Sequence, residues 1–128
     1  MLQKKAIRIV SFAKYHDHTK PLFKNLNCMN LYDIVYFKTQ ILMYKIKQNS
    51  VPLNIRQHFS VNICHNFSTR SKQKGSFVVK YCRTKAKSFT VSIIGVKNWN
   101  LLASELTCAC SINVFKRKLK KQIFSKYV

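Results

Sequence analysis

Acidic side chains are nearly absent from this chain. Asp17, Asp33 and Glu105 stand against 24 lysines and arginines, which gives a formal net charge of +21. Most basic side chains therefore have no acidic partner within the chain, and a compact fold must tolerate their mutual repulsion. A polyanion would relieve that repulsion, so nucleic acid is the first partner class to consider and an anionic membrane surface is the second. The alternative explanation of the positive charge is AT-biased coding drift, which enriches Lys, Asn, Ile, Phe and Tyr together, and this chain is rich in all five.

Glycine and proline are also scarce, at two residues each, and no uncharged run approaches the roughly 20 residues that span a bilayer. Gly75 and Gly95 are isolated, so there is no glycine-rich loop to hold a phosphate. Acid–base and two-metal catalysis need several carboxylates close together, and the three in this chain are far apart. We therefore expect no catalytic residues, no cofactor, no membrane span and no enzyme activity of its own.

The cysteines do not form the pattern of a disulfide scaffold. Their number is odd, at five, and their spacing is wide and irregular. The pairs Cys64–His65 and Cys108–Cys110 lack the spacing of a structural zinc site, so we expect no metal. The basic N-terminus has too short an apolar stretch for a secretory signal. These features favour reduced thiols in an intracellular protein, nuclear or cytoplasmic and not secreted.

The strongest helix signal covers residues 30–48. Asn30 can cap the first turn, and Asp33 three residues later completes a variant of the capping box. The apolar surface of this segment is broad, which predicts a helix buried on most sides or one that packs on another domain or subunit. A second helix is expected over 111–128, where Ser111 is a good N-cap and apolar residues recur at helical spacing among lysines and an arginine.

Two segments are typical of strands. Residues 76–84 and 88–96 are rich in β-branched and aromatic side chains, and the short basic stretch 85–87 between them predicts a hairpin. Each strand would have one apolar face, formed by Phe77, Val79 and Tyr81 in the first and by Phe89, Val91 and Ile93 in the second. The chain is thus expected to be one small α+β domain, 1–128, that is mainly helical. Its parts would be N-terminal helices (1–52), an irregular part with a central β-hairpin (53–97) and a helical part (98–128) that ends in a basic amphipathic helix.

Basic residues gather beside the expected hairpin and along the last helix. Loops of this kind can follow a phosphate backbone while exposed aromatic rings stack on bases; the alternative is a solvated basic face with no ligand. The candidate nucleic-acid-binding residues are Arg70, Lys72, Lys74, Arg83, Lys85, Lys87, Lys116, Arg117, Lys120 and Lys121. Trp99, the only tryptophan, could stack on a base, but its neighbours favour a structural anchor that caps the core of the hairpin.

Several motifs follow one another along the chain: "AIRIVSFAKYHDHTKPLFKNLN", "NLYDIVYFKTQILMYKIKQNSVP", "HNFSTRS", "YCRTKAKSFTVSIIGVKNWNLLASEL" and "SINVFKRKLKKQI". In this order and spacing, from about Ala6 to Lys121, they resemble the region near the C-terminal end of reverse transcriptase polyproteins of non-LTR (LINE-type) retrotransposons. That region lies beyond the polymerase thumb. Val96 and Ala103 stand where the family usually has proline, and Phe67 where it often has tyrosine, which is typical of a degraded or domesticated copy.

The resemblance implies where the chain originates and which activity it lacks. Polymerase activity in this family resides upstream, in modules whose paired aspartates bind magnesium, and Asp17 and Asp33 do not match that motif. The implied product is a non-catalytic fragment that binds RNA or DNA electrostatically, with a polymerase domain as a possible missing partner. Two alternatives stay open: a protein-interaction module that packs on a polymerase domain or other partner, and a pseudogene-derived product without a selected function.

Overall fold

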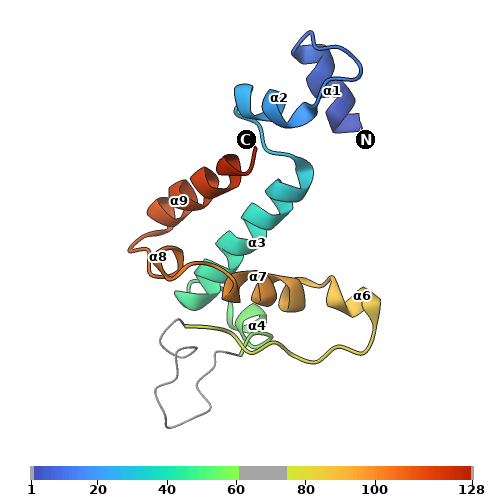
Figure 1. Ribbon diagram of the computed structural model, residues 1–128. Coiled ribbons are helices and arrows are strands. Elements are labelled where there is room, and N and C mark those ends of the chain that lie inside the picture. Colours follow the sequence, from blue (N-terminus) through green and yellow to red (C-terminus); the bar gives the residue numbers. More distant parts are fainter. Residues whose placement is uncertain (1, 61–74, 128) are drawn as a thin grey trace.

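Every regular element in residues 2–60 and 75–127, the part of the chain that this computed structural model describes, is a helix (Figure 1). The expected α+β class is therefore wrong, because these residues contain no β-strand and no central hairpin. In chain order the elements are α1 (Leu2–Val10), α2 (Thr19–Asn25), α3 (Leu31–Lys47), α4 (Leu53–Arg56), α6 (Lys85–Ser88), the π-helical turn η1 (Val91–Gly95), α7 (Val96–Asn100), α8 (Ser104–Thr107) and α9 (Ile112–Ser125).

The two long helices begin at side-chain caps. The Asn30 side chain accepts a hydrogen bond from the Tyr32 backbone N–H at 3.0 Å, and α3 starts there. The Ser111 hydroxyl accepts from the Val114 N–H at 3.4 Å, and α9 starts there. Each cap satisfies a backbone donor that the first turn leaves unpaired. The helices predicted over 30–48 and 111–128 are confirmed, with ends that differ by a few residues.

Helices α3 and α9 pack antiparallel and lie side by side in Figure 1. Tyr44, near the end of α3, stacks on Phe115, near the start of α9, with ring centroids 4.7 Å apart. At the other end of the pair, the Tyr127 hydroxyl donates to the Asp33 carboxylate. Asp33 was expected to complete a capping box at the start of its own helix. Its hydrogen bond instead joins residues far apart in the chain and fixes the start of α3 against the C-terminus.

Trp99 belongs to α7, and its side chain packs in the core against α9. Its side chain is 1% exposed, and its ring centroid is 5.8 Å from that of Phe115 and 6.1 Å from that of Phe77. Its indole N–H donates to the Gly75 carbonyl at 3.4 Å. Buried tryptophan combines a large apolar surface with a polar group that needs a partner, and both needs are met here. Trp99 therefore packs among helices and does not cap a hairpin.

The first expected strand, 76–84, has no continuous apolar face. Phe77 is buried, but Val79 and Tyr81 are exposed. The side chain of Asn100 pairs with the backbone of Phe77: it accepts from the Phe77 N–H at 3.0 Å and donates to the Phe77 carbonyl at 2.8 Å. An asparagine in α7 thus supplies the hydrogen bonds that a neighbouring strand would have supplied.

The second expected strand, 88–96, is helical from Val91 onward. Ile93, Val96 and Trp99 are buried at three-residue spacing, which is the period of a helix face. A short apolar run fits either a strand or a buried helix, and tertiary packing decided here for the helix. A Cβ atom built on Gly95 would lie 3.1 Å from Thr39 Cγ2, so glycine permits the close approach of η1 to α3.

The N-terminal helices α1 and α2 pack on one another and bury Ile7 and Phe23. They are tied to α3 by Gln3, whose side chain donates to the Met29 carbonyl at 3.1 Å and accepts from the Leu31 N–H at 2.9 Å. A single hydrophobic cluster includes residues from all three expected parts of the chain. None of the helices at 2–60 and 75–127 has both the length and the apolar character needed to cross a membrane.

Candidate nucleic-acid interface

Lys85 and Lys87, the basic residues expected in the hairpin connection, lie on α6, and Arg83 lies just before its N-cap. Arg83, Lys85 and Lys87 are all exposed. The Thr84 side chain caps this short helix by accepting from the Lys87 backbone N–H at 3.4 Å. A helical turn replaces the expected loop, and it still presents its cations to solvent.

Two aromatic side chains flank these cations. Tyr81, before α6, is 88% exposed, and Phe89, directly after it, is 72% exposed. Sequence reasoning assigned both rings to the apolar faces of the hairpin and so missed them as candidate site residues. Their position on either side of the basic stretch 83–87 was the available signal. Exposed rings beside cations are the combination that single-stranded nucleic acids bind, because bases stack on rings while phosphates contact the cations.

A second basic surface runs along α9. Phe115, Leu119 and Ile123 face the core, so the residues between them face outward. Lys116 is half-buried, and the others are exposed: Arg117, Lys118, Lys120 and Lys121. The Lys120 ammonium lies 5.5 Å from the centroid of the Phe124 ring. Since a helix rises about 1.5 Å per residue, these cations occupy less than two turns and form a dense patch.

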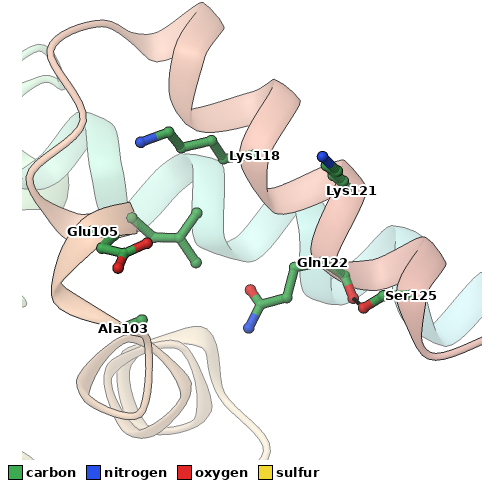
Figure 2. Close-up of a pocket in the computed structure, with 7 residues that line it drawn as sticks. Ala103, Glu105, Lys118, Lys121, Gln122 and Ser125 are labelled. Atoms are coloured by element: carbon green, nitrogen blue, oxygen red, sulfur yellow. Dashed lines mark hydrogen bonds between the residues drawn. The ribbon is translucent and has the colours of Figure 1, made fainter.

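A groove of about 460 Å³ lies beside this patch, between α8 and α9 (Figure 2). Lys118 and Lys121 line it from α9, and Glu105 lines it from α8. Figure 2 shows the Gln122 side chain extending from α9 toward Ala103. The cationic groups at the groove outnumber the single carboxylate, which makes it a continuation of the basic surface of α9.

The two basic surfaces are separate. Figure 1 shows α6 and α9 on opposite sides of the molecule with α7 between them. The expected residues Arg83, Lys85 and Lys87 thus lie together, and Lys116, Arg117, Lys120 and Lys121 lie together elsewhere. Arg70, Lys72 and Lys74 lie outside the described residues, as do Cys64 and His65.

Within 2–60 and 75–127, no three His, Cys, Asp or Glu side chains come close enough to hold a metal ion. The described cysteines are free thiols; Cys28, Cys108 and Cys110 are exposed and Cys82 is half-buried. Two acidic groups contact neutral donors: Asp17 accepts from the Lys14 backbone N–H at 2.8 Å, and Asp33 accepts from the Tyr127 hydroxyl. These contacts leave the positive charge of the surface largely unopposed.

The chain matches no protein-family model, no curated protein and no solved structure with which it was compared.

Proposed function

We propose that this protein binds single-stranded nucleic acid, RNA or DNA, through the surface around α6. The observation that carries the proposal is the exposure of Tyr81 and Phe89 on either side of Arg83, Lys85 and Lys87. Lysine-rich faces without a ligand are common, but here two exposed rings flank the cations and offer bases a stacking surface that cations alone lack. The basic face of α9 attracts the phosphate backbone whatever the base sequence. The net charge of +21 adds to this attraction.

Salt titration of oligonucleotide binding tests the charge part of this proposal. Replacement of Arg83, Lys85 and Lys87 by alanine should weaken binding and reduce the log–log salt slope by roughly 2, because each phosphate contact to a single strand contributes about 0.7. The matched control removes the same charge elsewhere, at the exposed Lys14, Lys38 and Lys45. The control should change the slope much less. Affinity that is indifferent to ionic strength would exclude this function.

Removal of the rings tests the stacking part. Tyr81→Ala with Phe89→Ala should weaken single-strand binding by about 1–3 kcal/mol per ring and leave the salt slope unchanged. Duplex binding should change little, because bases in a duplex are already stacked. Phe12→Ala with Tyr15→Ala is the matched control, since these rings are also exposed but lie at the N-terminal helices. Equal losses in both double variants would argue against a stacking site at α6.

The proposed origin is the C-terminal region of a LINE-type reverse transcriptase, and the support for it is the ordered resemblance of motifs between Ala6 and Lys121. On this proposal the chain is a fragment without polymerase activity of its own. The genomic sequence immediately upstream tests it. A polymerase palm there, in frame or frameshifted, would support the proposed origin, and unrelated sequence would contradict it.

A protein-interaction role is the second candidate, and a specific observation on α3 favours it. Leu31, Ile34 and Val35 are exposed on one side of the first turns of this helix. An apolar surface of this kind fits a site that packs on a polymerase domain or another protein. Sedimentation of the isolated chain tests the idea: a monomer that unfolds cooperatively would argue against a missing partner, and self-association or weak cooperativity would support one.

A further inference from the structure

A cavity of about 250 Å³ lies where α1, α2, the start of α3 and the C-terminal residues meet. It is on the opposite end of the α3–α9 pair from the Tyr44–Phe115 stack and is separate from the surface around α6. Lys4, Lys20 and Lys126 line it, each contributed by a different part of the chain. Three cations at one small cavity oppose one another, and an anion between them would lower that repulsion.

The one carboxylate at the cavity, that of Asp33, already accepts a hydrogen bond from the Tyr127 hydroxyl. The same hydroxyl accepts from the Asn30 backbone N–H at 3.0 Å. Burial, and then the hydrogen bond to Asp33, raise the pKa of Tyr127 to about 12. The hydroxyl therefore keeps its proton at neutral pH. Among the described residues, the charged lining comprises three ammonium groups and one carboxylate, an excess of two positive charges.

The packing of the helices sets where the three lysines lie around the cavity. The Lys126 ammonium lies 5.5 Å from the centroid of the Tyr36 ring, and Tyr36 follows Asp33 by about one turn of α3. Lys20 is in the first turn of α2, next to Thr19, which is buried at the cavity wall. Lys4 belongs to α1, which the Gln3 side chain ties to the start of α3. Tertiary contacts therefore place the backbone of all three lysines around one space, where their side chains are exposed.

A second cavity of about 550 Å³ adjoins the first. The two share Lys4, Phe23 and Asn30 in their walls. Tyr32, which is largely exposed, lines the second cavity together with Leu31. A charged space thus adjoins a less charged one that has an aromatic ring in its wall. This combination fits a phosphate that is attached to a sugar and a base.

We propose that the lysine-lined cavity binds a phosphate monoester, the terminal phosphate of a nucleic-acid strand. A monoester carries a charge of about −1.5 to −2 at neutral pH, which matches an excess of two positive charges. A diester within the strand carries one negative charge and matches it less well. The identity of the ligand as a nucleic-acid end rests on the proposed function; the phosphate site itself does not.

Binding of one short single-stranded oligonucleotide in 5′-phosphorylated, 3′-phosphorylated and unphosphorylated forms tests the inference. One of the phosphorylated forms should bind roughly tenfold more tightly than the unphosphorylated form, as expected for a charge-assisted contact. Replacement of Lys4, Lys20 and Lys126 by alanine should abolish this preference. The control variant with alanine at Lys14, Lys38 and Lys45 removes the same charge and should keep it.

Asp33→Asn is a second variant, and its expected effect is opposite in sign. It removes the carboxylate from the cavity, and its amide oxygen can still accept from Tyr127. The preference for a terminal phosphate should therefore increase several-fold, and loss of folding cannot produce that result. An unchanged or weaker preference in a folded Asp33→Asn protein would contradict the site.

The outcomes separate this inference from the proposed function. Equal affinity for all forms of the oligonucleotide, with normal salt dependence, overturns the phosphate site and leaves nucleic-acid binding in place. Absence of oligonucleotide binding, with inorganic phosphate or a mononucleotide still bound in a way that needs Lys4, Lys20 and Lys126, supports the phosphate site and overturns its assignment to a strand end. Absence of binding to every probe overturns both.

Discussion

The two halves of α3 are similarly apolar in sequence and opposite in environment. In the second half, Gln40 and Met43 are fully buried, whereas in the first half Leu31 and Val35 are 60% and 59% exposed. The difference lies in what packs on each half. The second half packs on η1 at Met43 and on α9 at Tyr44, while backbone N–H groups at the start of the helix donate hydrogen bonds to Gln3 and Tyr127. Apolar composition alone therefore does not predict which part of a helix is in the core.

The largest effect is expected from Trp99, which packs beside the buried half of α3. Trp99→Ala should lower the free energy of unfolding by about 3–5 kcal/mol, because it removes a large side chain from the centre of the core. Urea unfolding followed by circular dichroism measures this loss. Leu101→Ala is the matched control: Leu101 is largely exposed, so its removal should change stability by less than about 0.5 kcal/mol. A folded Trp99→Ala protein of nearly normal stability that no longer bound nucleic acid would reverse the structural assignment.

Tyr127→Phe tests the tie at the exposed half. The change leaves the Asp33 carboxylate and the Asn30 N–H without their partner, and we expect a loss of about 1–3 kcal/mol. This loss should depend on pH. The pKa of Tyr127 is raised from 10.0 to about 12 in the folded state, so its contribution is complete below pH 10 and disappears as the pH rises through 12.

Lysines lose their charge in the same pH range, so the useful quantity is the difference in stability between the wild type and Tyr127→Phe. That difference should be constant from pH 7 to about 9.5 and should shrink between pH 10 and 12. A difference that stays constant to pH 12 would show that the Tyr127 hydroxyl does not stabilise the fold through these hydrogen bonds.

Gln40→Met, in the buried half of α3, should stabilise the protein, whereas the two preceding substitutions should destabilise it. Gln40 is fully buried, and neither of its side-chain polar atoms has a hydrogen-bond partner among the described residues. Burial of an unpaired amide costs about 1–3 kcal/mol, and methionine has a similar shape without that cost. We expect a gain of about 1–2 kcal/mol in urea unfolding. Gln57→Met, at an exposed position, should give no gain; a loss at Gln40 would mean that its amide has a partner in the folded protein.

The smallest effect is expected at the exposed half. Leu31→Ser and Val35→Ser should each change stability by no more than about 0.5 kcal/mol, because neither side chain packs in the core. Met43→Ser, in the buried half of the same helix, is the comparison and should cost several times more. A large loss at Leu31 or Val35 would indicate that this surface is covered in solution. Sedimentation would then show whether a second copy covers it.

Sequence patterns predicted the long helices well because their signals are local. Asn30 and Ser111 act as caps within their own first turns, and the apolar spacing after Ser111 matches the buried face of α9. The hairpin was predicted wrongly because its residues make non-local contacts. Asn100 holds the backbone of Phe77, and Gly95 lets η1 approach α3. Neither contact can be predicted from the local amino-acid composition.

The candidate site was only partly predictable, because some of its features follow from local sequence and others from non-local packing. The positive charges of Arg83, Lys85 and Lys87 are visible in the sequence, and their exposure follows from the cost of burying unpaired charge. The exposure of Tyr81 and Phe89 was not predictable, because aromatic residues are usually buried and only the absence of a second strand leaves them in solvent. Lys4, Lys20 and Lys126 are brought together only by the packing of helices that are distant in the chain.

The burial of Trp99 has a practical consequence for the optical properties of this protein. It is the only tryptophan in the chain and is buried in the core, whereas Tyr81 and Phe89 are exposed. Its fluorescence should therefore be emitted at short wavelength, shift to longer wavelength on unfolding, and change little when a ligand covers the outer rings. The intrinsic emission of this chain should thus report on the integrity of its core, while quenching of tyrosine emission reports on occupancy of its surface.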